Sequence, residues 1–366
     1  MFGSTIGNIF KITTWGESHG RGVGVVIDGC PAGLPLSEAD VQIFLNRRKP
    51  GQSPYSTPRN EADQVEILSG IFERKTTGTA ISMMVWNKTA RSADYSEIAG
   101  YYRPGHADYT FDEKYGFRDY RGGGRSSGRE TIGRVAAGAV ASKFLNHLGI
   151  TLQAYTRSIG PVMIDESHPD FEIMYENPLN MPDSAAAARA EILLRKMIAD
   201  KDSIGGTIDC IIQGLPVGLG DPVFEKLDAN LAKAIMSIGS VKGVEIGDGF
   251  RASEAYGSEN NDAFVCDTYG ITKKTNHSGG ILGGMSDGSP IHLRAAIKPT
   301  PSIFKTQQTV NKARENIDIQ IKGRHDPVIV PRAVVVVESM AAITVTDALL
   351  ANMTSRMDKI LDFYRK

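Results

Sequence analysis

Ile27-Asp-Gly-Cys-Pro-Ala-Gly-Leu34 and Ile212-Gln-Gly-Leu-Pro-Val-Gly-Leu219 share one pattern, and about half of the 366-residue chain separates them. Each segment follows an apolar run that predicts a β-strand and precedes a helix signal. A second pair, Gly78-Thr-Ala-Ile81 and Gly288-Ser-Pro-Ile291, repeats a turn followed by a strand. Similar segments at this spacing indicate an internal duplication. We therefore expect a single domain over residues 1–366, built from two duplicated halves at about 1–185 and 186–366.

Capping and stop signals predict the helices. Ser37 and Asp40 resemble a capping box, Asp221 caps a helix whose first turn contains Pro222, and Gly149 is a C-terminal stop signal. The expected helices are 37 to about 48, 221–238, about 129–148, 184–199, and 346 to the C-terminus. The final helix keeps its apolar residues at helical spacing, so one face should pack against the protein.

Apolar and alternating runs predict the strands, which include 22–28, 80–86, 207–212, 291–297 and 333–337. Together with the helices they indicate an α+β fold in which two βαβ-like halves share one core and helices cover antiparallel sheets. A Rossmann-type doubly wound sheet is disfavoured because no Gly-x-Gly-x-x-Gly segment follows a strand and opens a helix.

Composition narrows the function classes. The chain has 41 Lys and Arg residues against 42 Asp and Glu residues, so its total charge favours neither a nucleic-acid nor a membrane partner. Cys30, Cys210 and Cys266 lie far apart, without metal-ligand spacing, so we expect no disulfide framework, no metal site and a reducing cytoplasm. Residues 1–20 lack an apolar leader, and the longest apolar runs, such as Val334–Val337, have strand length. We expect a protein that is neither exported nor membrane-embedded.

A glycine-rich run, Arg121-Gly-Gly-Gly-Arg-Ser-Ser-Gly-Arg129, leads into the small-residue helix. Glycines allow close backbone approach, while serine hydroxyls, helix-start N–H groups and arginines suit a phosphate. The alternative is a flexible arginine-glycine loop that binds RNA. An ordered helix start and the lack of repetition argue against it.

Three further segments are weaker signals. Gly279-Gly-Ile-Leu-Gly-Gly284 fits a structural turn as well as a ligand-facing loop, and Lys298-Pro-Thr-Pro-Ser302 is compatible with phosphate contact. The run Arg47-Arg48-Lys49 ends a helix, where basic residues are favoured by the helix dipole in any case.

His19 and His106 each lie in a glycine-bracketed loop beside acidic or hydroxyl groups, which favours proton transfer over a purely structural role. Asp326 is expected just before a buried strand, in a loop of the kind where sites form. A serine hydrolase at Ser18 or at the pair 126–127 is disfavoured, although both segments match Gly-x-Ser-x-Gly, because this short pattern alone is only a weak signal.

Six motifs in order along residues 16–339 together resemble the chorismate synthase family. They are Gly16-Glu-Ser-His-Gly20, Arg103-Pro-Gly-His-Ala-Asp108, Gly122 to Arg129, Arg134-Val-Ala-Ala-Gly138, Gly279 to Gly284, and Arg324-His-Asp-Pro327. The resemblance implies four long helices sandwiched between two antiparallel sheets, with pseudo-two-fold duplication, in a homotetramer. It also implies a lyase that needs reduced FMN to eliminate phosphate from 5-enolpyruvylshikimate 3-phosphate, which yields chorismate for aromatic amino acid biosynthesis.

The resemblance assigns roles to individual residues. His19 would protonate the departing phosphate, His106 would protonate the reduced flavin near N1, and Asp326 would lie near flavin N5. The implied substrate-binding residues are Arg48, Arg103, Arg129 and Arg134. The implied FMN-binding residues are Arg125, Ser126, Ser127, Gly239, Ser240, Gly283, Lys298, Pro299, Thr300, Pro301, Ser302 and Arg324.

Two departures from the family pattern concern the reductant and the flavin loop. Many relatives have arginine at the position of Pro54 and serine at that of Pro301. The first departure puts an NADPH contact in doubt, and the second removes one hydroxyl from the flavin loop. Pro54 favours NADPH as an indirect reductant, through a separate flavin reductase, over reduction of the flavin by the chain itself. A flavin-dependent oxidoreductase and an RNA-binding protein remain the alternatives. The histidine loops favour the lyase, and a net charge of −1 does not fit RNA binding.

Overall fold

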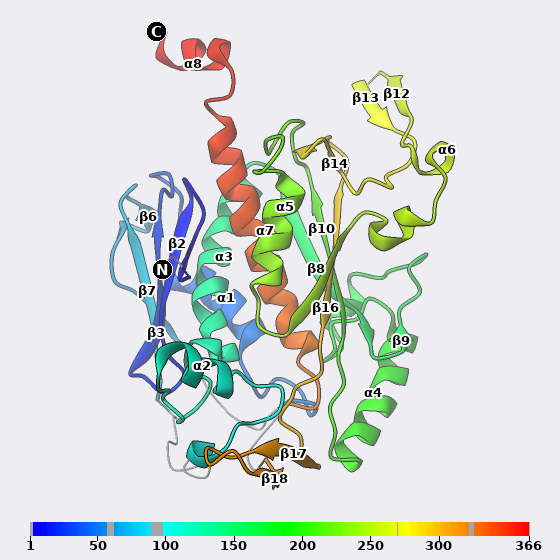
Figure 1. The fold of residues 1–366 in the computed structure, drawn as a ribbon. Helices are drawn as coiled ribbons and strands as arrows, with labels where there is room; N and C mark the ends of the chain where they lie inside the picture. The colour runs from blue at the N-terminus through cyan, green and yellow to red at the C-terminus, as the bar shows by residue number, and fades with distance from the viewer. Residues whose placement is uncertain (1–2, 57–61, 89–97, 269, 322–325, 366) are drawn as a thin grey trace.

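The computed structural model describes residues 3–56, 62–88, 98–268, 270–321 and 326–365 (Figure 1). Four helices form its middle layer, namely α1 (Glu38–Arg48), α3 (Thr131–His147), α5 (Leu227–Met236) and α7 (Val330–Asn352). α3 and α7 pack against each other, α1 contacts both, and α5 packs on α7. A sheet covers each side of this layer (Figure 1).

The first sheet has the strand order β1-β2-β3-β7-β4. Its strands are β1 (Thr5–Ile6), β2 (Lys11–Gly16), β3 (Gly22–Asp28), β7 (Ile81–Trp86) and β4 (Val65–Ile67). Along β7 the side chains of Ile81, Met83 and Val85 are buried, whereas the alternate ones are partly or fully exposed, as the two-residue period of a strand requires.

The second sheet has the order β11-β16-β10-β8-β9. Its strands are β11 (Val241–Ile246), β16 (Ile291–Ile297), β10 (Gly206–Gln213), β8 (Thr151–Ile159) and β9 (Val162–Met163). All the described strand pairs of both sheets are antiparallel. The expected mixture of helices and antiparallel sheets is therefore confirmed.

Short hairpins and helices complete the described chain. The hairpins are β5 (Ile71–Phe72) with β6 (Lys75–Thr76), β12 (Phe264–Asp267) with β13 (Gly270–Lys273), β14 (Ile281–Leu282) with β15 (Met285–Ser286), and β17 (Thr306–Val310) with β18 (Asn316–Gln320). The remaining helices are α2 (Asp108–Tyr115), α4 (Ser184–Ala199), α6 (Gly257–Asn260) and α8 (Met357–Tyr364). The β12–β13 arm and α8 project from the body (Figure 1).

The two repeated segments make the same hydrogen bonds. The hydroxyl of Thr76 donates to the carbonyl of Pro31 at 2.6 Å and accepts from the N–H of Leu34 at 2.9 Å. Ser286 does the same with Pro216, at 2.6 and 2.9 Å. In each case a hydroxyl of a short hairpin holds the loop that follows a central strand.

One predicted strand is wrong. Residues 333–337 lie inside α7, so the final long helix begins at Val330 rather than at Thr346, and Asp326 precedes a helix rather than a strand. α7 is apolar nearly all round because sheets or helices cover most of its surface, which hides the helical period, and its valines favour a strand by propensity. α7 is long and apolar enough to cross a membrane, but 78% of its most apolar window is buried in the protein, as in a core helix.

The other helix predictions differ mainly at their starts. α1 begins after Ser37, whose N–H donates to the Asp40 carboxylate at 2.8 Å, and α4 has the predicted bounds. α5 begins at Leu227 rather than near Asp221, because the preceding residues form a turn closed by a hydrogen bond from Asp221 N to the Glu225 carbonyl at 3.2 Å.

Candidate active site

The four core helices share one end, at which α1 and α5 finish and α3 and α7 begin. Arg48, the last residue of α1, donates from Nε to the hydroxyl of Thr131 at 3.0 Å. Arg332, in the first turn of α7, donates to the carbonyl of Arg48 at 3.2 Å. Arg134 donates to Ser237, just beyond α5, at 2.6 Å. Two helix N-termini therefore open towards the same region, and their N–H groups and dipoles favour bound anions.

Two 3₁₀ turns, η2 (Gly124–Ser126) and η3 (Gly128–Glu130), carry the glycine-rich run into α3. Ser127 lies between the turns, and its hydroxyl accepts from the N–H of Arg129 at 3.3 Å. Arg125 donates to two backbone carbonyls of β2, at 3.0 and 3.1 Å. The run is thus an ordered helix start fixed to the first sheet, as the sequence predicted.

The same run contacts His19, which lies in the loop after β2. A Cβ on Gly122 would fall 2.4 Å from His19 Nδ1, and Gly122 has φ +150°. Only glycine leaves room for the imidazole there. The hydroxyl of Ser18 lies 3.2 Å from the same nitrogen. Because Gly122 has no side chain, His19 can pack directly against the glycine-rich run that leads into α3.

A buried carboxylate joins two of the expected substrate arginines. Asp63 accepts from Arg48 at 2.7 Å and from Arg129 at 2.9 Å, through different oxygens. Asp63 has φ +44°, which residues other than glycine seldom adopt. Arg48 is only 4% exposed and also donates to the carbonyl of Gly128 at 3.1 Å. Two guanidinium groups share one carboxylate, so the trio keeps one net positive charge.

Arg134 connects α3 to the end of α5. It donates to Glu130 at 2.8 Å and, from Nη1, to the hydroxyl of Ser237. The other oxygen of Glu130 accepts from Thr14 in β2 at 2.9 Å. A single carboxylate thus fixes Arg134 relative to the first sheet.

Arg103 and His106 lie in one loop before α2. Arg103 donates to both carboxylate oxygens of Asp108, at 2.8 and 2.7 Å, and this pair is nearly buried. His106 Nδ1 lies 2.9 Å from the carbonyl of Pro104, so this nitrogen must carry the proton. Its Nε2 then accepts from the hydroxyl of Ser302, also at 2.9 Å. Burial, followed by the charge of Arg103, lowers the pKa of His106 to about 4.

The segment after β16 meets the His106 loop. The ammonium of Lys298 donates to the carbonyl of Gly105 at 3.1 Å, and its backbone N–H donates to the carbonyl of Ser240 at 2.9 Å. Burial, and then the charge of Lys242, lowers the pKa of Lys298. The Thr300 hydroxyl oxygen is buried and has no hydrogen-bond partner among the described residues. A ligand that accepts or donates one hydrogen bond would satisfy it.

Gly239 and Ser240 follow the end of α5, next to Lys298. Gly283, in contrast, lies in the turn of the β14–β15 hairpin. The carbonyl of Gly284, the next residue, accepts from the N–H of Leu227, the first residue of α5, at 2.8 Å. A helix of ten residues such as α5 is about 15 Å long. Gly283, although expected to bind flavin, therefore lies at the opposite end of α5 from Gly239 and Ser240.

Asp326 lies just before α7 and accepts from Arg332 at 2.6 Å. Because Arg332 also donates to the carbonyl of Arg48, Asp326 is tied to the end of α1. Arg324, which was expected to bind flavin, lies outside the described residues. Pro299 and Pro301 belong to the Lys298 segment, and a Cβ on Gly105 would fall 2.7 Å from the Pro301 side chain.

Comparison with known proteins matches nearly the whole chain to one family. The family model described as chorismate synthase matches residues 10–350. The chain belongs to the chorismate synthase family. A chorismate synthase of Agathobacter rectalis is 69% identical over 366 residues, and one of Methanococcoides burtonii is 56% identical over 353 residues, covering 100% and 96% of both chains respectively. A crystal structure of chorismate synthase superposes with a TM-score of 0.78 at 31% identity, covering 98% of this chain and 96% of that one.

Membership of the chorismate synthase family makes this chain an enzyme, a lyase that forms chorismate. Sequence reasoning missed several residues that hold its candidate site together: Asp63, Asn87, Glu130, Ser237 and Arg332. Arg332 was hidden by the strand predicted over 333–337. Glu130 has a local partner, Arg134, but it also binds Thr14 far away in the chain. Asp63, Asn87 and Ser237 carry no local signal, because their partners lie far away in the chain.

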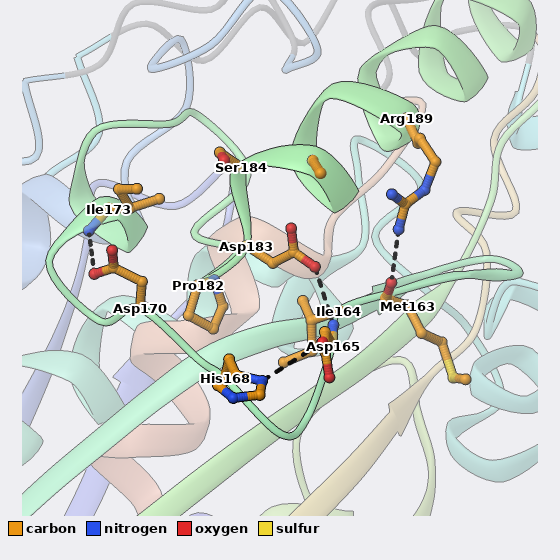
Figure 2. Close-up of a pocket in the computed structure, with 11 residues that line it drawn as sticks. Met163, Ile164, Asp165, His168, Asp170, Ile173, Pro182, Asp183, Ser184 and Arg189 are labelled. Atoms are coloured by element: carbon orange, nitrogen blue, oxygen red, sulfur yellow. Dashed lines mark hydrogen bonds and ion pairs between the residues drawn. The ribbon is translucent and has the colours of Figure 1, made fainter.

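A separate hollow of about 580 Å³ lies beside the start of α4 (Figure 2). It is lined by β9, the loop after it and the start of α4, and none of the expected site residues belongs to it. Asp183 already accepts from the N–H of Ala186 in the first turn of α4, and His168 is largely exposed. Three carboxylates, of Asp165, Asp170 and Asp183, line the hollow together with one arginine, Arg189, so it suits a phosphorylated substrate less well than the arginine-rich helix end does.

Metal ligation has no visible basis in the part of the chain that the structure describes. No group of three or more His, Cys, Asp or Glu side chains there could hold a metal ion. The cations that face the shared helix end are arginines and a lysine, which bind anionic groups directly.

Proposed function

We propose that this protein eliminates phosphate from 5-enolpyruvylshikimate 3-phosphate in a 1,4 sense, with reduced FMN bound, at the end shared by the four core helices. The observation that carries the proposal is the convergence of two helix N-termini with Arg129, Arg134 and His19. The substrate has a phosphate and two carboxylates, and burying such an anion without paired cations would be prohibitive. Arg48, Arg103, Arg129 and Arg134 would supply these cations.

The expected flavin residues fit a phosphorylated, partly buried group. The hydroxyl of Thr300, which has no hydrogen-bond partner in the described part of the chain, and the Lys298 ammonium lie in one segment, next to the Gly239–Ser240 turn. Arg125, Ser126, Ser127, Pro299, Pro301, Ser302 and, outside the described residues, Arg324 would complete the set. When bound, reduced FMN would lend electron density to the substrate ring as the carbon–oxygen bond breaks, and would take it back as a hydrogen leaves the carbon at the other end of the allylic system. Gly283 lies at the other end of α5, so a flavin bound at the Lys298 segment of the same chain would not contact it.

The protein's own residues would then manage protons. His19 would protonate the departing phosphate oxygen, and Asp326 would hold a proton released near flavin N5. His106 is neutral in the ligand-free protein, since its pKa is about 4. An anion beside its ring, near flavin N1, would favour the charged imidazolium and raise that pKa, so that His106 becomes an acid only in the loaded site.

We further propose a cytoplasmic homotetramer. Cys30 and Cys210 are buried thiols outside any disulfide, which supports a reducing compartment. Large apolar side chains on the projecting arm, such as Phe250, Tyr256 and Phe264, are mostly exposed, which supports contact with further copies of the chain. NADPH would act only indirectly, through an external flavin reductase, since Pro54 replaces the arginine of many relatives. Nucleic acid and membranes are not expected partners.

The domain is proposed to be one unit of two duplicated halves. Four strands of the first sheet lie in the order β2-β3-β7-β4, and four of the second lie in the order β8-β10-β16-β11. In each set the edge strand, β4 or β11, is reached from the second strand through a helix, α1 or α5. The matching bonds of Thr76 and Ser286 support the same relation. Because β8 pairs in the second sheet, the proposal places the division between α3 and β8, near Gly149, rather than at residue 185.

An anaerobic assay with dithionite-reduced FMN tests the reaction. Substrate and product differ by phosphoric acid and by no net electrons, so chorismate formed should exceed the flavin supplied many-fold, with the flavin still reduced at the end. Oxidised FMN should support no turnover. One product per reduced flavin, or equal rates with oxidised FMN, would refute the elimination and favour a flavin-dependent oxidoreductase.

A further inference from the structure

Asn87 lies just beyond β7, between two parts of the candidate site. Its side-chain amide nitrogen donates to the carbonyls of Glu17 at 2.9 Å and Gly20 at 2.8 Å. These two residues bracket His19 in the chain. The backbone N–H of Asn87 also donates to the carbonyl of Arg21 at 3.0 Å. One residue therefore fixes both ends of the short loop that carries His19.

The opposite atom of the same amide faces the arginine pair. Asn87 Oδ1 accepts from Nε of Arg129, whose Nη1 donates to Asp63. The orientation of the amide is determined by its partners, since a flipped group would point N–H at N–H and oxygen at two carbonyl oxygens. Both hydrogens and the oxygen of this side chain are thus used, and no other residue type of this size offers two donors and an acceptor in that arrangement.

We propose that Asn87 is a positioning residue for the elimination: it holds the His19 loop at a fixed distance from Arg129 and, through Asp63, from Arg48. This inference rests on the proposed role of His19. The imidazole must meet the leaving oxygen of a phosphate held by the arginines, and a misplacement of about 1 Å can cost roughly 100-fold in rate. Asn87 itself does not touch the reacting atoms in this account.

Asn87→Asp is the sharpest variant. An aspartate keeps an oxygen for Arg129 but replaces both donors by an acceptor, which repels the carbonyls of Glu17 and Gly20. With saturating reduced FMN, we expect kcat to fall about 10- to 100-fold, while the Kd for FMN stays within about 2-fold of the wild type. Asn87→Ala removes the contact to Arg129 as well, so its KM for substrate should also rise.

Asn177 provides a matched control. Its amide nitrogen also bridges two carbonyls, of Ile173 at 3.0 Å and Met181 at 2.8 Å, and none of the described hydrogen bonds of its side chain goes to His19 or to an expected substrate arginine. Asn177→Asp breaks the same kind of bridge and should leave kcat unchanged per folded molecule. An equal loss of kcat in both aspartate variants would mean that Asn87 contributes only to general stability, and would overturn the proposal.

A double-mutant cycle with His19→Ala separates positioning from other effects. If Asn87 acts through His19, Asn87→Asp should lower kcat by less than about 3-fold in the His19→Ala background. A full additional loss there, or wild-type kcat in the single variant, contradicts the proposal.

Hydrogen exchange of the ligand-free protein gives a readout that does not depend on turnover. The peptide spanning Gly16 to Gly22 should exchange faster by about 10-fold or more in Asn87→Asp, and not in Asn177→Asp. Unchanged protection of this peptide overturns the inference by itself. A wild-type protein that forms no chorismate with reduced FMN would instead overturn the proposed function. Hydrogen exchange needs no turnover, so it separates this outcome from a failure of the proposed role of Asn87.

Discussion

His106 illustrates how a single residue couples the site to pH. Its ordinary pKa of 6.5 is lowered to about 4 in the folded protein by burial and then by Arg103. Between these two values the unfolded chain binds a proton that the folded protein does not, so stability falls as pH falls through this window. The contribution is fully present above pH 6.5 and amounts to at most about 3 kcal/mol.

Urea unfolding of the wild type and His106→Gln at pH 7 and pH 4.5 tests this difference. The carboxylates that lose their favourable pairs in acid are common to both proteins, so the comparison isolates the imidazole. We expect the free energy of unfolding to fall further in the wild type than in the variant. Equal losses would mean that the pKa of His106 is the same in the folded, ligand-free protein as in the unfolded chain.

At the scale of the elements, the contact between α3 and α7 depends on small residues. A Cβ on Gly138 would fall 2.2 Å from the Cβ of Ser339, and Ser339 is fully buried. The two helices can therefore approach closely only with glycine at this position. Since α3 and α7 both begin at the candidate site, this contact also sets the distance between the two N-termini.

Gly138→Ala should lower stability by about 1–3 kcal/mol or more, because the helices must separate or shift. Substrate affinity should fall as well, since the same shift moves Arg134 away from Ser237. Gly257→Ala is the control, because nothing lies within 4 Å of a Cβ built there and its φ is not positive. Thermal unfolding and the KM for substrate provide the measurements, and a Gly138→Ala protein as stable as the control would show that the interface adapts.

For the whole molecule, the parts that local sequence specifies could be predicted. The α1 capping pair of Ser37 and Asp40, the stop at Gly149 with φ +75°, and the strands at 22–28 and 291–297 all depend on neighbours in the chain. α7 could not be predicted correctly from its pattern, because burial on most sides removes the polar face that reveals a helix.

The candidate site was predictable in its residue types but not in its internal pairing. The motifs contained His19, His106 and the arginines, yet the carboxylate that joins Arg48 to Arg129 was not singled out. This carboxylate, Asp63, binds Arg129 across 66 positions at 2.9 Å, and elsewhere Glu338 binds Arg47 across 291 positions at 2.7 and 2.8 Å. Such partners are brought together only by the packing of the four helices between the sheets.

The most direct test of the central claim is a crystal structure of the protein with oxidised FMN and substrate bound. The account predicts that the substrate phosphate lies at the start of α3, within hydrogen-bond distance of His19 and Arg129, with the flavin against the Lys298–Ser302 segment. Both ligands located elsewhere, for example in the hollow beside α4, would contradict the assignment of the shared helix end as the active site.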